Sequence, residues 1–119
     1  MSNAGGIGTL GAIGLSAVGL RTEIRRTKRM LDPGITAFGV DLLLPAVGGS
    51  ARSTNEDYTG GQLEALVQVM VEEAVPLFVC AVGIPPRWVV EKLHDHGQLV
   101  MNMVGAPKHA VKAVLLAWA

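Results

Sequence analysis

The sequence is short of cysteine, of aromatic residues and of net charge. Its one cysteine, Cys80, lies in an apolar run, which excludes a disulfide framework. We expect it to be a small buried hydrophobic residue in a reducing compartment. Ten basic residues balance ten acidic ones, and 4% of the residues are aromatic. A surface that binds nucleic acid needs excess positive charge and stacking platforms, so we expect no nucleic-acid partner.

Residues 1–20 carry no charged side chain. A secretory signal would need a basic start before its apolar stretch. A membrane-spanning helix would not normally contain the six glycines found there. We therefore expect a cytoplasmic protein with no membrane partner.

Hydrophobic residues are abundant in this chain of 119 residues. They make up 50% of it, and the mean hydropathy is +0.40, which is high for a free-standing soluble domain of this size. We expect one small domain, residues 1–119, much of which is covered by something else.

A single carboxylate, Asp41, interrupts the apolar run at residues 38–45. The run predicts a strand buried on both faces, as in parallel sheets, ended by Pro45. An ionised carboxylate out of water costs several kcal/mol unless it is paired, and the late ends of parallel strands are where ligands bind. Asp41 therefore either faces a ligand or is satisfied by loop amides.

Strand and helix patterns alternate four times, with a period near 30 residues. Strands are expected at residues 8–13, 38–45, 77–82 and 99–104, and helices at 17–31, 62–74, from about 86, and 107–116. Such alternation indicates parallel strands with right-handed crossovers. Four units make either an open doubly wound sheet or half of an eightfold barrel.

The first helix is expected to begin after Ser16, with Leu20, Ile24 and Thr27 inward. Its basic residues should face water; they are Arg21, Arg25, Arg26, Lys28 and Arg29. In the helix that follows Pro86, the residues expected inward are Trp88, Val89 and Leu93.

Three other features bear on function. The polar loop at residues 46–60 has the length of a lid or binding loop, where Arg52 and Tyr58 either reach a ligand or stay solvated. The G-x-G-x-x-G match at residues 6–11 is rejected as a dinucleotide site, because no strand precedes it. His94 and His96 lack partners at ligand spacing, so no metal site is expected.

Several segments together resemble nitronate monooxygenases, formerly called 2-nitropropane dioxygenases. Residues 2–8 (Ser-Asn-Ala-Gly-Gly-Ile-Gly) are similar to that family's S-N-A-G-G-x-G segment, and residues 38–45 to its F-G-V-N-L-L-L-P strand. Residues 78–86 and 100–105 are similar to its next two strand ends. The resemblance covers roughly residues 2–113.

The resemblance implies an α/β fold, a partial (β/α)8 TIM barrel, in an FMN-dependent oxidoreductase. Such a flavoprotein oxidises alkyl nitronates with dioxygen to carbonyl compounds and nitrite. The cofactor-binding residues implied are Gly83 and Asp41. Asp41 stands where the family has an asparagine, and a carboxylate there cannot donate a hydrogen bond unless it is protonated.

The resemblance also implies a fragment, truncated at both ends, with strands two to five of the family barrel. None of the three histidines stands at the family's catalytic position, so no catalytic residue is assigned, and the chain alone is expected to be inactive. Two alternatives stay open. One is a half-barrel assembly module that associates through its sheet edges. The other is a related flavin barrel, an enoyl reductase or an inosine-dehydrogenase-like protein.

Overall fold

The computed structural model describes residues 1–46 and 50–115, which form four strands, each followed by a helix. After a short 3-10 turn, η1 (Ser2–Ala4), come β1 (Gly8–Gly11), α1 (Ala17–Met30), β2 (Phe38–Leu43), α2 (Leu63–Glu72), β3 (Leu77–Ala81), α3 (Arg87–Asp95), β4 (Leu99–Asn102) and α4 (Pro107–Ala113). All eight expected elements are present, within a few residues of the expected bounds. The G-x-G-x-x-G segment runs into β1 itself, so the region after it is a strand, as expected, and not a helix.

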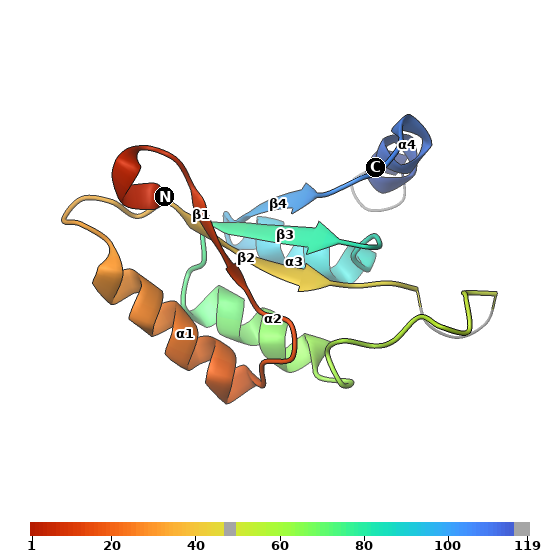
Figure 1. Ribbon diagram of the computed structural model, residues 1–119, viewed down its shortest axis with the longest axis horizontal. Helices are drawn as coiled ribbons and strands as arrows, with labels where there is room; N and C mark the ends of the chain where they lie inside the picture. The colour runs from red at the N-terminus through yellow and green to blue at the C-terminus, as the bar shows by residue number, and fades with distance from the viewer. Residues whose placement is uncertain (47–49, 116–119) are drawn as a thin grey trace.

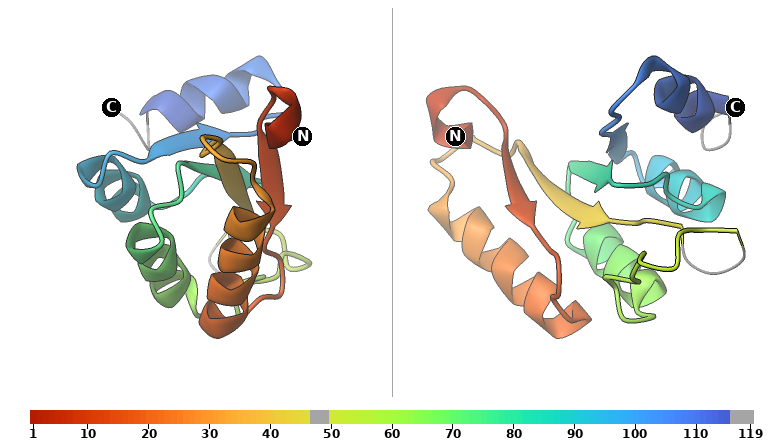
Figure 2. Two further views of the ribbon diagram at one scale, coloured as in Figure 1. Left: turned by 90° about the vertical axis from the view of Figure 1, so that its left-hand side faces the viewer. Right: turned by 45° about the vertical axis from the view of Figure 1, so that its right-hand side comes forward.

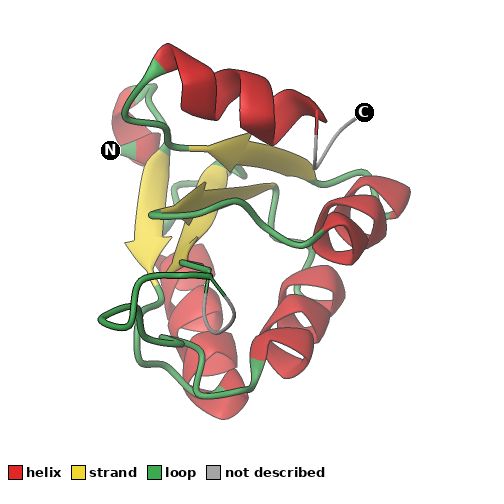
Figure 3. Cartoon of the chain, turned by 90° about the vertical axis from the view of Figure 1, so that its right-hand side faces the viewer, coloured by secondary structure: helices red, strands yellow, loops and turns green. Residues whose placement is uncertain are grey.

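The strands form one parallel sheet in the order β1-β2-β3-β4. In Figure 1 the four arrows fan out, from a steep descent at β1 to a slight rise at β4, and β2, β3 and β4 all point to the right. Figures 2 and 3 show that α1, α2, α3 and α4 follow one another in an arc around the outside of the curved sheet. The expected parallel α/β architecture is therefore confirmed.

The hydrophobic core lies between the sheet and the helices α1, α2 and α3. From the sheet, Val40, Phe78 and Cys80 are almost fully buried there, and α1 contributes Leu20 and Ile24. The α1 residues are the ones expected inward. The Ser16 side chain accepts a hydrogen bond from the Gly19 N–H, at 3.1 Å, and so caps α1 as expected.

Two predictions about buried faces are wrong. In α3, Trp88 is 40% exposed, and Val90 is buried in its place beside Val89 and Leu93. The strand at residues 38–43 is covered by helices on one face only, because Phe38, Val40 and Leu42 face the helices while Asp41 lies on the opposite face. We call this second side of the sheet the open face.

The prediction that the basic residues of α1 all face water is also wrong. Three of them converge on the carboxylate of Glu73, just after α2: Arg21 at 2.8 Å, Arg25 at 3.0 Å and Lys28 at 3.3 Å. Burial opposes ionisation of Glu73, but the hydrogen bonds and charges of these partners outweigh it and hold the pKa of Glu73 below its usual value. These contacts join α1 to the end of α2.

None of the helices among the described residues is long and apolar enough to cross a membrane.

Candidate functional site

A cavity of about 1040 Å³ lies at the carboxyl ends of β2, β3 and β4. Its floor is formed by the residues at those strand ends, Leu43, Gly83 and Asn102 among them. The loop between β2 and α2 borders it, and α4 closes another side with His109 and Lys112. In parallel sheets and barrels this is the edge where ligands bind.

The wall at Gly83 is built by very close packing of two strand ends. A Cβ atom placed on Gly83 would lie 1.9 Å from the backbone oxygen of Leu44, so no side chain fits there. The preceding residue, Val82, has a φ of 66°, an unusual conformation for a β-branched residue. The backbone therefore turns sharply beside the cavity, and such strained turns are common at functional sites.

Asn102 ties the end of β4 to this turn. Its Nδ2 donates hydrogen bonds to the Gly83 carbonyl oxygen at 3.0 Å and to the Met103 carbonyl oxygen at 2.9 Å. Its Oδ1 is buried and has no hydrogen-bond partner among the described residues. Buried acceptors normally accept a hydrogen bond, so we expect this oxygen to accept one from a water or from a ligand N–H.

Cys80 supports the same carbonyl from the core side. Its Sγ donates to the Gly83 oxygen at 3.4 Å. Burial raises the pKa of Cys80 to about 12, against a smaller opposing effect of the Leu44 backbone hydrogen bond. The thiol therefore stays protonated at neutral pH and is a structural donor, because only a thiolate is a good nucleophile. The expectation of a small buried residue is confirmed.

The polar residues of the loop that borders the cavity mostly form hydrogen bonds within the loop. Asp57 accepts hydrogen bonds from the side chain and backbone of Thr59, at 2.6 and 2.9 Å, and from the Gly61 N–H. The Thr59 hydroxyl contact is the main reason why the pKa of Asp57 lies below its usual value. Asn55 donates to the Ala46 carbonyl oxygen at 2.7 Å. His109 and Lys112 lie across the cavity, on α4.

The two residues expected to bind a cofactor lie in different places. Gly83 is part of the cavity wall, whereas Asp41 is not. Asp41 is the fourth of six residues in β2, rather than at its end, and it lies opposite Gly11 on the open face. Leu43, two residues further along the same face, does reach the cavity. The role of Asp41 in cofactor binding stays a prediction.

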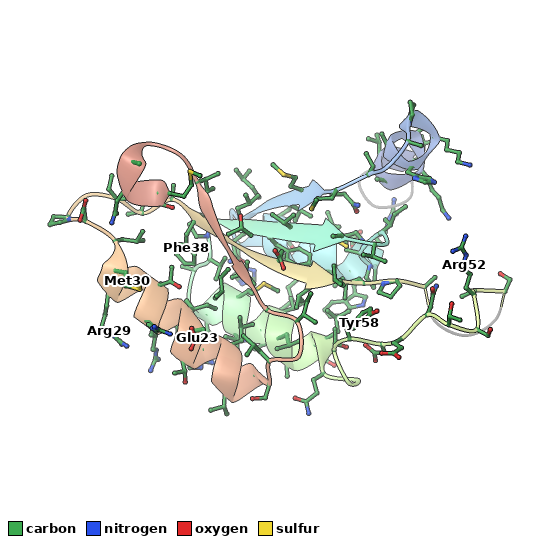
Figure 4. All side chains as sticks on the ribbon, in the orientation of Figure 1. Glu23, Arg29, Met30, Phe38, Arg52 and Tyr58 are labelled. Carbon is green, nitrogen blue, oxygen red and sulfur yellow. The ribbon has the colours of Figure 1, made fainter. Side chains whose placement is uncertain are left out.

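Arg52 and Tyr58 are exposed residues of the long loop, and neither borders the cavity (Figure 4). Part of that loop, residues 47–49, lies outside the described residues.

Sequence reasoning assigned no role to Asn102, His109 or Lys112. Two features of the sequence could have indicated them: Asn102 is an amide at the end of an apolar strand, and His109 and Lys112 are polar residues three apart on one helix face.

Within the described residues, no group of three His, Cys, Asp or Glu side chains could hold a metal ion.

No model of a protein family matches this sequence. The chain is similar to "Putative monooxygenase Rv1533" of Mycobacterium tuberculosis, with 26% identity over 92% of this chain and 40% of that protein. Among solved structures it is similar to FabK from Thermotoga maritima, with 25% identity and a TM-score of 0.75. It is also similar to nitroalkane oxidase from Streptomyces ansochromogenes, with 24% identity and a TM-score of 0.77.

These two structural likenesses each cover 99% of this chain but only 32% and 38% of the solved chains. The chain therefore spans between a third and two fifths of the relatives it matches. The fold is a partial (β/α)8 TIM barrel with four parallel units, as expected. The mycobacterial relative is named a putative monooxygenase, which is a kind of oxidoreductase, so oxidoreductases are the class of enzyme that this chain resembles.

Proposed function

We propose that this chain forms part of an FMN-dependent oxidoreductase that oxidises alkyl nitronates with dioxygen, giving carbonyl compounds and nitrite. One observation carries the proposal. The three segments that resemble strand ends of nitronate monooxygenases, at residues 38–45, 78–86 and 100–105, all end in the wall of one cavity. A shared location is expected if all three contact the same ligand.

The residues around the cavity suit a flavin. The volume is at the upper end of the range for cofactor pockets, about 300–1,000 Å³. Ile84, Met103 and Val104 supply apolar contacts for a ring system, and the Asn102 Oδ1 is an acceptor without a partner among the described residues. Lys112, across the cavity, offers positive charge to an anionic group such as a phosphate.

The chemistry divides between cofactor and protein. A flavin held in this cavity would supply the redox chemistry, which is the transfer of electrons from the carbanion-like nitronate to dioxygen. A nitronate is already deprotonated at that carbon, so the described residues need only bind, orient and shield the reactants. The Cys80 thiol, held protonated by burial, takes no part as a nucleophile. No catalytic residue is assigned to this chain.

A second candidate is a related flavin-barrel oxidoreductase, such as an enoyl reductase or an inosine-dehydrogenase-like enzyme. FabK matches this chain as well as nitroalkane oxidase does, with TM-scores of 0.75 and 0.77. The fold therefore supports both candidates equally. Two activity assays on a protein that contains this chain distinguish the two candidates. A nitronate-oxidising enzyme should release nitrite from an alkyl nitronate, and an enoyl reductase should reduce an enoyl thioester.

Binding of FMN tests the site directly in the 119-residue chain. We expect FMN fluorescence and its visible spectrum to change on titration with the chain. The Lys112→Met variant should raise the Kd about three- to tenfold, because it removes one charge near the bound anion. Lys108→Met is the matched control, since Lys108 is also on α4 but does not border the cavity. No spectral change at about 1 mM FMN, or equal Kd values for both variants, would contradict the assignment.

A further inference from the structure

The open face of the sheet carries two rows of side chains set by the strand register. One row is Thr9, Gly39, Leu77 and Leu99, and the next is Gly11, Asp41, Val79 and Met101. No described helix covers these rows, which lie on the inner side of the arc in Figure 3. Leu77 and Val79 on β3 are buried, whereas on β4 Leu99 is 67% exposed and Met101 is 52% exposed. Large apolar side chains therefore face water on β4.

Both edges of the sheet are also free within the described residues. β1 pairs with β2 on one side, and β4 pairs with β3 on one side. Their outer N–H and C=O groups are templates for another strand, and proteins normally cover or block such edges. The open face and the two edges form one continuous surface, which we call the open side.

The exposed area indicates how much surface needs a partner. The chain exposes 7061 Å². A folded monomer of 12.5 kDa would expose about 6,200 Å². The excess is roughly 900 Å², close to the 800 Å² or so that each partner buries in a standard interface. One partner of protein size would therefore account for it.

The side chains on the open face differ in size between the two edges of the sheet. At β1 they are small, Thr9 and Gly11, and at β4 they are large, Leu99 and Met101. A two-fold axis along the barrel axis would place β4 of one copy beside β1 of the other at two seams. Large side chains would then meet small ones, as packing inside a barrel requires. All strands would stay parallel.

We propose that the open side binds a second copy of this chain, so that two four-stranded sheets close into one eight-stranded parallel barrel. Eight is the number of strands at which such a barrel closes with its interior filled by side chains, and closure removes both free edges. The cavity at the carboxyl ends then continues onto the partner's β1. This proposal goes beyond the proposed function and does not depend on flavin binding.

The barrel geometry fixes which residues meet at the new seam. Rows of side chains are displaced by eight residues in one circuit of such a barrel, and hence by four across each copy. The position beside Thr9 of one copy is then Met103 of the other, four residues after Leu99. Within one copy these two residues are separated by three strand spacings, about 14 Å, and by four residues along the strand, about 13 Å, which is too far for a disulfide.

Sedimentation equilibrium of the 119-residue chain without flavin tests the proposal first. We expect a species of twice 12.5 kDa. Met101→Lys and Gly11→Val should both give monomers that keep the wild-type circular dichroism. Met101 is half exposed in one copy, and a Cβ at Gly11 makes only a 3.9 Å contact with Asp41. Val18→Lys is the control, because Val18 is 78% exposed on α1, away from the open side.

A disulfide test then checks the arrangement. On mild oxidation, the double variant Thr9→Cys, Met103→Cys should form disulfide-linked dimers that persist in denaturing electrophoresis and are lost on reduction, whereas Val18→Cys, Met103→Cys should form no such link. The native Cys80 is buried and does not compete. A monomer at about 100 µM would overturn the proposal in favour of a different occupant of the open side. A dimer that survives both Met101→Lys and Gly11→Val, or that lacks the disulfide, would overturn it too.

Discussion

At the scale of single residues, Gly83 and Asn102 define the candidate site. Gly83 allows β2 and β3 to approach so closely that no side chain fits, and Asn102 fixes the Gly83 carbonyl from β4. Neither role depends on a charge. The cavity wall is therefore made largely of backbone, held in place by one amide and by the Cys80 thiol.

We predict that Gly83→Ala destabilises the protein by at least about 1–3 kcal/mol, because the backbone of Leu44 must move to admit a Cβ. Urea unfolding at fixed protein concentration measures the change. Gly105→Ala is the matched control: Gly105 also borders the cavity, but a Cβ there meets nothing within 4 Å. Equal unfolding free energies for the two variants would show that the close packing at Gly83 is not needed.

At the scale of elements, α1 and α2 are joined by the three cations that converge on Glu73. Arg21, Arg25 and Lys28 are spaced by four and three residues, so they lie on one face of α1. Glu73 is only 8% exposed, whereas its neighbour Glu72 is exposed, forms an ion pair with Arg21 and accepts a hydrogen bond from Gln68. The buried carboxylate is thus the centre of the contact.

We predict that Glu73→Gln lowers the unfolding free energy by about 1–3 kcal/mol at pH 7, because charged hydrogen bonds to a buried group are lost. The pKa of Glu73 is lower in the folded than in the unfolded protein. This contribution is therefore present above the ordinary glutamate pKa of about 4.3 and is lost as pH falls through the folded value.

Urea unfolding at pH 7 and below pH 4 therefore measures the effect of this cluster. The difference between wild type and Glu73→Gln should shrink at the lower pH. Glu72→Gln, which removes one exposed ion pair, should change the unfolding free energy by less than about 1 kcal/mol. A Glu73→Gln effect that is no larger than this control would contradict the central role of Glu73.

At the scale of the whole molecule, the sheet has one face covered by helices and one face open. Closure with a second copy would bring both Asp41 carboxylates into the same barrel interior. Two like charges in a confined space repel each other, and each must also leave water. Asp41 would then limit the strength of association.

We predict that Asp41→Asn strengthens the dimer about tenfold, since the amide keeps the size of the side chain and removes the charge. Sedimentation equilibrium gives the dissociation constants. Asp95→Asn makes the same charge change at the exposed end of α3 and should leave the dissociation constant unaltered. A dissociation constant that Asp41→Asn does not lower would place Asp41 outside the interface.

The order and type of the elements could be predicted from the sequence, because apolar periodicity and turn residues are local signals. The partners of Glu73 could not, since Arg21 and Glu73 are 52 residues apart and meet only through packing of α1 on α2. The face of β2 on which Asp41 lies could not be predicted either, because an apolar strand sequence does not show that helices cover only one of its faces. The left-handed conformation of Val82 has no signal in its residue type.

The strand order β1-β2-β3-β4 also bears on how the chain acquires its structure. Every strand pairs with the next strand in sequence, so no strand among the four needs a partner from a distant part of the described chain. Such a topology has low contact order for a parallel sheet, which favours rapid folding. Each strand–helix unit can also dock as it leaves the ribosome, one after another from the amino terminus.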